Sequence, residues 1–450
     1  MKNTRRDFIK KTAGASALIA VGGVAPGFTA KSYGRIIGAN EKIRVSVGGV
    51  NSRGNVLAKN FAHQKNCDVI HVCDVDKRAI TKCLKNIEFQ KDVKAQGFSD
   101  FRKSLESKDV DAFVIAMPDH WHAPASLLAL QAGKNVYVEK PCSHNPAEGE
   151  ILRDAAAKYK LTVQMGNQRR SWPNVIKAIA ELKSGAIGRA YFGKGWYASN
   201  RGPIGKGKVV APPDWLNWDL WQGPAPRKSY KDNIVHYKWH WRWHWGTGEA
   251  LNNGTHMVDL LRWGLEVDYP TKVNSSGGRY HYAGDDWETP DTQVINLDFA
   301  DNKSISWEGR SCNGRTVDGQ SVAAVFYGEK GSLQINDNSY VIYDLKNKVV
   351  KDSKNSKNDA KVNALNKSDP SKNLDALHIQ NFFRAITSGE KLNADIDSGH
   401  KSILLVQLGN IAQRTGRTLN IDPKSGHIMN DKEAQKLWSR KYESGWEMKL

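Results

Sequence analysis

The stretch IRVSVGGVNSRG, residues 43–54, decides the fold of this chain. Its apolar first half is typical of a buried strand, and residues 55–63 continue in a helical pattern. Between them lies GVNSRG, which fits the fingerprint G-x-G-x-x-G except that asparagine holds the middle glycine position. Asparagine adopts positive backbone dihedrals more easily than most residues, so it is a tolerable replacement. The pattern predicts a dinucleotide-binding turn built from Gly49, Asn51, Ser52, Arg53 and Gly54.

The next strand-like run, DVIHVCD at residues 68–74, supports this interpretation. It ends in Asp74, twenty residues after Gly54, the spacing that brings a carboxylate to the adenosine ribose hydroxyls. A carboxylate there repels a 2′-phosphate, so the sequence favours NAD over NADP. A turn that merely joins a strand to a helix is the alternative.

Two further strands are predicted at residues 110–122 and 134–141, and each delivers polar residues at its carboxyl end. Open α/β sheets bind their ligands at that edge. Farther along, short runs at residues 292–300, 304–310, 322–328 and 331–337 are separated by turn residues, as antiparallel neighbours would be. Helical segments near residues 373–387 and 398–415 should pack back on this second sheet, and a tail with Trp438 and Trp446 should cover an edge or a neighbouring subunit.

Four stretches carry a family resemblance: FSDFRKSL at 98–105, MPDHWH at 117–122, EKP at 139–141 and VQMGNQRR at 163–170. In order and spacing they resemble the glucose-fructose oxidoreductase, inositol dehydrogenase and rhizopine-catabolism family, abbreviated Gfo/Idh/MocA. The resemblance implies an α/β fold with a Rossmann domain, residues 31–165, and a carboxy-terminal α/β domain, residues 166–450. The second domain should carry a large, mostly antiparallel sheet, which in this family often mediates homo-oligomers.

The same resemblance places Lys140 beside the nicotinamide and the reacting hydroxyl. An ammonium at a strand end can also stabilise a developing alkoxide and orient the hydroxyl, whereas the plain alternative is a surface ion pair with Glu139. The other residues expected around the cofactor are Pro118, His120, Trp121, His122, Glu139, Asn167 and Gln168.

The stretch EALNNGTHMVDLLRW, residues 249–263, should supply the proton-transfer group. The family typically has D-x-x-x-H here, and this chain has Asn252 and His256. An imidazole titrates near working pH, so His256 can take the hydroxyl proton. Asn252 holds no charge and can only orient its neighbours by hydrogen bonds. A buried histidine that caps a helix is the alternative.

Tryptophan is concentrated in WLNWDLWQGPAP, residues 215–226, and HYKWHWRWHWG, residues 236–246. The second stretch alternates indoles with basic side chains, which predicts a strand if it is regular at all. Such aromatics suit sugar rings, although they could equally fill a domain interface. A metal site at His236, His240 and His244 is disfavoured because that alternation argues against a helix and no acidic or cysteine ligand accompanies the run, so no metal is expected.

The functional expectation is an NAD-containing enzyme that moves hydride at a carbohydrate carbinol carbon. The rival is a redox-neutral glycoside-cleaving enzyme, similar to some relatives in the family. Such an enzyme oxidises the sugar at C3, which acidifies the C2 hydrogen, then eliminates the glycosidic substituent and reduces the product. Tyr197 and His240 are the candidates for the extra base and for substrate binding. A non-catalytic sugar-binding relic is the third possibility, since Asn51 and Asn252 depart from the family pattern.

The amino-terminal residues predict where in the cell the protein is sent. Residues 1–30 combine a basic start, an apolar run too short to span a membrane and a small-residue end. Residues 4–10, TRRDFIK, resemble a twin-arginine signal, which implies export of the folded protein to the periplasm by the twin-arginine machinery. The net charge of +19 can attract anionic partners, but the lysines are scattered apart from a polar stretch at residues 346–372, expected to be a solvated loop, so no nucleic-acid partner is expected.

Overall fold

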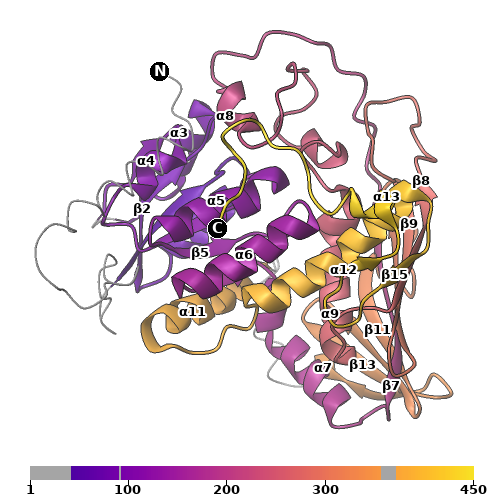
Figure 1. Cartoon of the computed structure of the whole chain (residues 1–450). Coiled ribbons are helices and arrows are strands. Elements are labelled where there is room, and N and C mark those ends of the chain that lie inside the picture. The colour runs from indigo at the N-terminus through magenta and orange to yellow at the C-terminus, as the bar shows by residue number, and fades with distance from the viewer. Residues whose placement is uncertain (1–41, 91–92, 356–370) are drawn as a thin grey trace, which may run out of the picture.

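The computed structural model describes residues 42–90, 93–355 and 371–450. The twin-arginine segment and most of the lysine-rich stretch lie outside these ranges. The described residues form two sheets flanked by helices, in an α/β arrangement (Figure 1). None of the helices within these ranges is long and apolar enough to cross a membrane.

The amino-terminal domain is a Rossmann domain, as predicted. In the described chain, its sheet has six parallel strands in the order β3-β2-β1-β4-β5-β6. The order reverses between β1 and β4, which creates the crevice where such sheets bind ligands. The strands are β1 (Ile43–Gly48), β2 (Cys67–Cys73), β3 (Gln96–Phe98), β4 (Ala112–Ile115), β5 (Asn135–Val138) and β6 (Val163–Met165). The helices are α2 (Arg53–Ala62), α3 (Lys77–Asn86), α4 (Phe101–Leu105), α5 (Asp119–Gln131) and α6 (Pro146–Tyr159).

The second sheet is mostly antiparallel, also as predicted. Its ten described strands have the order β14-β13-β12-β11-β7-β10-β9-β8-β15-β16, and only β7 and β10 pair in parallel. The strands are β7 (Ala190–Ala198), β8 (Lys272–Gly278), β9 (Thr292–Phe299), β10 (Lys303–Arg310), β11 (Val322–Gly328), β12 (Gly331–Asn336), β13 (Ser339–Asp344), β14 (Val349–Asp352), β15 (Leu419–Ile421) and β16 (Ile428–Met429).

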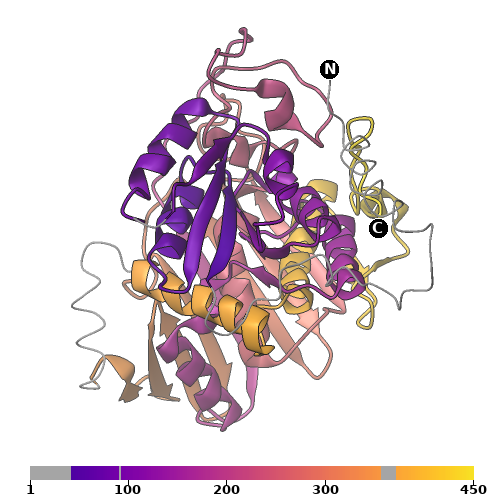
Figure 2. The same cartoon turned by 90° about the vertical axis from the view of Figure 1, so that its left-hand side faces the viewer.

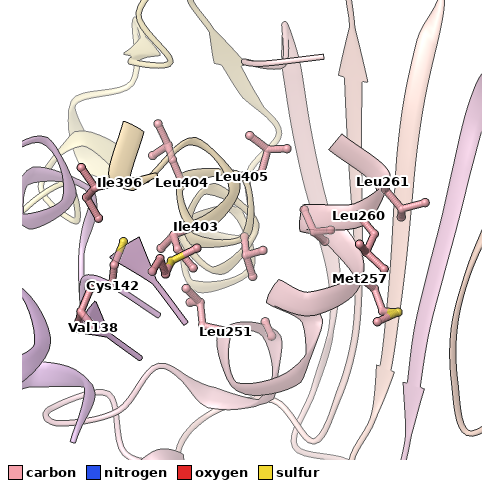
Figure 3. Close-up of a cluster of buried hydrophobic side chains, with 14 of the residues drawn as sticks. Val138, Cys142, Leu251, Met257, Leu260, Leu261, Ile396, Ile403, Leu404 and Leu405 are labelled. Atoms are coloured by element: carbon pink, nitrogen blue, oxygen red, sulfur yellow. The ribbon is translucent and has the colours of Figure 1, made fainter. Parts of the chain in front are cut away.

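Helices cover the face of this sheet that is turned toward the Rossmann domain (Figure 1). They include α7 (Pro173–Lys183), α9 (Thr255–Leu265) and α12 (Ile396–Thr415). Figure 3 shows the apolar core that results, in which α12 with Ile403 lies between Val138 of the Rossmann sheet and Leu260 of α9. Because this core is continuous across both domains, the position of α9 relative to the Rossmann sheet is fixed by packing.

Helix α11 (Ser371–Ser388) differs from the expectation that it would pack on the second sheet. Figure 2 shows it beside the Rossmann domain, where Phe382 and Phe383 join the core of that domain. Phe383 packs edge-on against Phe61 with ring centroids 5.7 Å apart, and Phe382 packs likewise against Tyr137 at 5.9 Å. The Rossmann core is therefore completed by a helix more than 200 residues away in sequence from β6.

The carboxy-terminal tail also returns to the Rossmann domain, after Gln435 has contacted the edge strand β16 by donating to the Ile428 carbonyl at 2.8 Å. The Trp446 ring packs edge-on against Trp121 of α5, with centroids 5.2 Å apart. Arg440 donates to the Glu148 carboxylate of α6 and to the His120 carbonyl, both at 2.7 Å. The tail thus covers α5 and α6, as Figure 1 shows in yellow.

The tryptophan-rich segment is not a strand, contrary to the sequence expectation. Residues Lys238–Trp241 form a 3-10 turn, η3, and Trp218 and Trp221 lie in the short helix α8 (Trp218–Gln222). The buried indoles form a small core of their own, in which the Trp245 ring packs edge-on against both Trp218 and Trp221. Mutual packing of the large rings, and not alternation between two faces, sets the backbone path here.

Candidate functional site

A cavity of about 450 Å³ lies where the carboxyl ends of the Rossmann strands face the tryptophan-rich segment and the start of α9. This volume is in the range of small-molecule sites. Its wall combines the glycine-rich turn, the strand ends and the second domain. Of the residues predicted from sequence, those that line it are Gly49, Asn51, Ser52, Arg53, Asp74, Pro118, Trp121, His122, Glu139, Lys140, Gln168, His240, Asn252 and His256.

The glycine-rich turn leads directly from β1 into α2. Gly49 has a φ of +80°, and a Cβ at this position would lie 2.6 Å from the Ala116 carbonyl oxygen. A Cβ at Gly54 would lie 2.0 Å from the Gly49 oxygen, so this glycine lets α2 start against the turn without itself lining the cavity. Ser52 precedes α2 without capping it through its side chain, and no acidic residue lies in the first turn. The amino terminus of α2 is therefore a suitable place for a pyrophosphate.

Asp74 lies at the end of β2, on the wall of the same cavity. Its carboxylate accepts hydrogen bonds from the backbone amides of Val50 at 2.7 Å and Asp76 at 2.9 Å. Burial raises the pKa of Asp74 to about 6, which these amide hydrogen bonds oppose. Asp74 is thus tied to the glycine-rich turn, and a ribose diol bound there meets an oxygen acceptor, while a 2′-phosphate meets a carboxylate.

Lys140 and Asn252 are in direct contact. The Lys140 Nζ donates to the Asn252 backbone oxygen at 2.5 Å and to its side-chain Oδ1 at 3.2 Å. Asn252 lies in the π-helical turn η4 (Ala250–Gly254), which continues into α9, so the helix runs through both Asn252 and His256. Burial lowers the pKa of Lys140, and Glu139 and Asp119 oppose this effect.

His256 lies in the first turn of α9 and lines the cavity. Its Nδ1 is buried and accepts or donates no hydrogen bond among the described residues. Burial, and then the positive charges of Lys140 and Arg169, hold the pKa of His256 well below its ordinary value. The imidazole is therefore neutral at physiological pH and can accept a proton.

Glu249 is a member of the site that the sequence did not reveal. Its buried carboxylate accepts from the Asn252 Nδ2 at 3.3 Å, from the Ser311 hydroxyl at 3.0 Å and from the Arg201 Nε at 2.7 Å. Because Asn252 donates to Glu249 through Nδ2, its Oδ1 is turned toward Lys140. The charge that Asn252 lacks is therefore present one hydrogen bond away.

Asp375 of α11 is the second residue that the sequence gave no signal for. Both its oxygens accept from the Arg53 guanidinium, at 2.8 and 3.1 Å, and Arg53 also donates to Glu139 at 2.8 Å. Gln168 donates to the same Glu139 oxygen at 3.0 Å. This network ties the glycine-rich turn to the strand end that carries Lys140.

Besides Gly54, three predicted residues do not line the cavity. His120 is fully buried, and its Nε2 lies 2.9 Å from the Trp221 carbonyl because the tryptophan core packs over it. Asn167 is buried beside the cavity, and neither of its side-chain polar atoms has a partner in the described chain. The Tyr197 hydroxyl accepts from Arg201 at 3.1 Å instead of facing the cavity.

The three histidines considered for a metal have separate partners. His236 contacts the Asp76 carboxylate at 2.8 Å, while His240 and His244 contact the carbonyls of Tyr237 and Pro226. Within residues 42–90, 93–355 and 371–450, no cluster of three or more ligating side chains could hold a metal ion.

A nicotinamide dinucleotide fits these residues. The turn has room for a phosphate at an uncapped helix start, Asp74 is placed for the adenosine ribose, and Lys140 and His256 lie on the wall of the same cavity. The fold and the site together define a two-domain oxidoreductase with an NAD-binding Rossmann fold.

The chain belongs to the Gfo/Idh/MocA oxidoreductase family. Residues 43–167 match the family's NAD-binding Rossmann fold, and residues 193–448 match its carboxy-terminal α/β domain. This confirms the family indicated by the sequence.

Similarity to individual curated relatives is lower and partial. A glycosyl hydrolase family 109 protein of Saccharopolyspora erythraea is 27% identical over 51% of this chain and 55% of its own length. An alpha-N-acetylgalactosaminidase of Shewanella oneidensis is 23% identical over 43% of this chain and 45% of its own length. The chain thus spans about half the length of these relatives.

Solved structures share the fold over most of the chain. The WlbA dehydrogenase of Bordetella pertussis, crystallised with NADH and UDP-GlcNAcA, superposes with a TM-score of 0.61 at 18% identity. The match covers 85% of this chain and 99% of that one. At this identity the likeness shows a common fold.

Proposed function

We propose that this protein is an exported NAD-dependent enzyme that oxidises a hydroxyl-bearing carbon of a sugar or glycoside and keeps its cofactor bound. The observation that carries the proposal is the convergence of Lys140, Asn252 and His256 on the wall of one cavity, which also contains the glycine-rich turn and Asp74. A cofactor site and an acid/base site that share a cavity are what oxidation of an alcohol requires.

The roles follow from the hydrogen bonds. When bound, NAD supplies the hydride acceptor for the carbinol carbon. Lys140 has three N–H donors and directs two of them to Asn252, so one is left for the substrate hydroxyl. The ammonium stabilises the oxygen as negative charge develops on it. Neutral His256 lines the cavity and takes the hydroxyl proton.

The sugar as substrate is supported by the aromatic wall and by the relatives. Trp121, Trp172, Trp221, Trp239 and Tyr237 line the cavity together with polar side chains, a combination that suits the C–H faces and hydroxyls of sugar rings. The names of the relatives, a glycosyl hydrolase family 109 protein and an alpha-N-acetylgalactosaminidase, point to the same class of substrate.

Those names also favour a second candidate, the redox-neutral cleavage of a glycoside. This reaction needs an additional base for the hydrogen on C2. Tyr197 is held by Arg201 outside the cavity, which leaves His240. Its Nδ1 lies 2.6 Å from the Tyr237 carbonyl and must donate, so Nε2 is the unprotonated nitrogen. Burial lowers the pKa of His240 to about 3, and it also lowers the pKa of His256, so basicity does not separate the two candidates. The dehydrogenase needs no base beyond His256, and for this reason the geometry supports it better.

Export is part of the proposal on the strength of the twin-arginine pattern at Arg5 and Arg6. A destination poor in free dinucleotide requires a cofactor that stays bound and is regenerated in place, by a second sugar or by the same one.

Product analysis tests the proposal directly. The purified protein is incubated with a panel of glycosides, and the products are identified by mass spectrometry. A ketosugar that retains its aglycone supports the dehydrogenase, whereas a freed aglycone without net redox change supports the second candidate. Absence of both products across the panel would contradict the two functions together.

A further inference from the structure

Tyr237 occupies an unusual position at the cavity. It lines the same cavity as Lys140 and His256, yet 46% of its surface is exposed. The tyrosine therefore lies at the mouth of the cavity, where the reacting sugar would meet solvent. Large exposed aromatic side chains beside a ligand cavity are candidates for ligand contacts.

Several contacts hold Tyr237 in place despite this exposure. The Tyr237 hydroxyl accepts from the Arg201 Nη1 at 3.1 Å, and its ring packs against His240 with centroids 4.5 Å apart. Its carbonyl accepts from the His240 Nδ1 at 2.6 Å. A ligand that stacks on this ring does not have to immobilise it first, which favours binding.

Arg201 anchors Tyr237 to the catalytic side of the cavity. It donates to Glu249 at 2.7 Å, and its guanidinium lies 5.0 Å from the centre of the buried Trp241 ring. Glu249 in turn holds Asn252, the partner of Lys140. One chain of hydrogen bonds thus fixes the distance between Tyr237 at the mouth of the cavity and Lys140 at the reacting hydroxyl.

The charges identify the class of ligand. The Arg201 guanidinium beside Tyr237 is paired with the Glu249 carboxylate, so this cation is already compensated and is a poor partner for a phosphate or a carboxylate. The surface offers an aromatic ring and the Nε2 of His240, which makes no hydrogen bond to the described residues and can accept one from a hydroxyl. Such a surface suits a neutral ring that carries hydroxyls or is itself aromatic.

We propose that Tyr237 is the platform of an outer subsite that binds the second ring of a glycoside, either an aglycone ring or a neighbouring sugar. The inference rests on the proposed function, because the inner cavity is taken to hold the sugar that reacts. It makes a glycoside, and not a free monosaccharide, the preferred substrate.

Matched ligand pairs test this subsite. The probes are methyl and phenyl glycosides of glucose, galactose, N-acetylglucosamine and N-acetylgalactosamine in both anomeric forms, and the dissociation constants are measured by calorimetry with the full-length protein saturated with NAD. For at least one pair the phenyl glycoside should bind about 3- to 10-fold more tightly than the methyl glycoside, the range expected for one aromatic contact.

The variants assign the preference to the ring. Tyr237→Ala should abolish it, and Tyr237→Phe should keep most of it. Tyr280→Ala is the matched control, because Tyr280 is 71% exposed but does not line the cavity, and this variant should behave as the wild type. Circular dichroism melting checks that each variant folds.

The outcomes separate the subsite from the proposed function. A phenyl preference that depends on Tyr237 supports the subsite even where no product forms, which would contradict the function alone. Turnover without any phenyl preference, a preference that survives in Tyr237→Ala, or no binding of any probe overturns the subsite.

Discussion

The side-chain amide of Asn252 lies between a carboxylate and an ammonium: its Nδ2 is 3.3 Å from the Glu249 Oε1, and its Oδ1 is 3.2 Å from the Lys140 Nζ. The neutral residue therefore connects two charged ones and transmits the orientation of Glu249 to Lys140. Where the family typically has an aspartate, this chain holds the negative charge three residues earlier in sequence.

We expect Glu249→Gln to lower kcat by roughly 10-fold with a smaller change in KM, because Asn252, which orients Lys140, loses its charged partner while the cavity keeps its shape. The steady-state constants measure this. Adding Asn252→Asp to Glu249→Gln returns a carboxylate to the Lys140 contact and should recover part of kcat. A double variant slower than Glu249→Gln would show that Glu249 acts only through packing with Arg201.

Lys140→Ala and His256→Ala should each fold normally and lose at least ~10² in turnover, the usual effect of removing a positioned electrostatic or acid/base group. Single-turnover assays with the loaded enzyme measure this loss. His281→Ala, at an exposed histidine that does not line the cavity, is the control and should keep wild-type rates. Wild-type rates in both site variants would refute their assignment.

The pH dependence of kcat/KM should reflect the two shifted groups. Burial lowers the pKa of His256, so its basic form persists on acidification. The midpoint of the acid limb should therefore lie below pH 6.5, the ordinary pKa of histidine. Burial also lowers the pKa of Lys140, so the ammonium loses its proton at a lower pH than an ordinary lysine. The midpoint of the alkaline limb should therefore lie below pH 10.5, the ordinary pKa of lysine.

Lys140→Arg should move the alkaline limb upward and leave the acid limb in place, because arginine stays protonated. An acid limb above pH 7 in the wild type would contradict a neutral His256.

Asp74→Ser should relax the preference for NAD. Removing the carboxylate removes its repulsion of a 2′-phosphate, so we expect the ratio of the NADP and NAD dissociation constants to move toward NADP by at least about 10-fold. Fluorescence titration of protein freed of its cofactor measures both constants. An unchanged ratio would place the adenosine ribose away from Asp74.

Protein purified without added nucleotide and then denatured should release close to stoichiometric NAD(H). With negligible free ligand, only a very small dissociation constant and slow release keep the cofactor bound. Chromatography of the supernatant quantifies it. A preparation free of cofactor that is active only with millimolar NAD would refute the argument from export.

The sequence by itself determined the parts of this protein that depend on local pattern. The strand, turn and helix of residues 43–62 were predictable because a side chain at Gly49 or Gly54 would collide with neighbouring backbone, so the turn requires glycine there. Asp74 was predictable because the length of the following helix and strand sets its distance in sequence from the turn. The short strands of the second sheet were predicted from short runs separated by turn residues. The family motifs placed Lys140, Asn252 and His256 near one another, and they do line one cavity.

Only the tertiary structure decided which distant residues complete these parts. Asp375 reaches Arg53 because α11 packs on the Rossmann core, and nothing local in its sequence indicates this. The tryptophan-rich segment alternates like a strand but folds into turns, since packing among large rings outweighs a weak local preference. Glu249, Arg201 and Tyr237 form one hydrogen-bonded chain although they come from separate segments. Local periodicity fixes backbone geometry over a few residues, whereas buried charges and exposed rings acquire their partners only when the domains pack together.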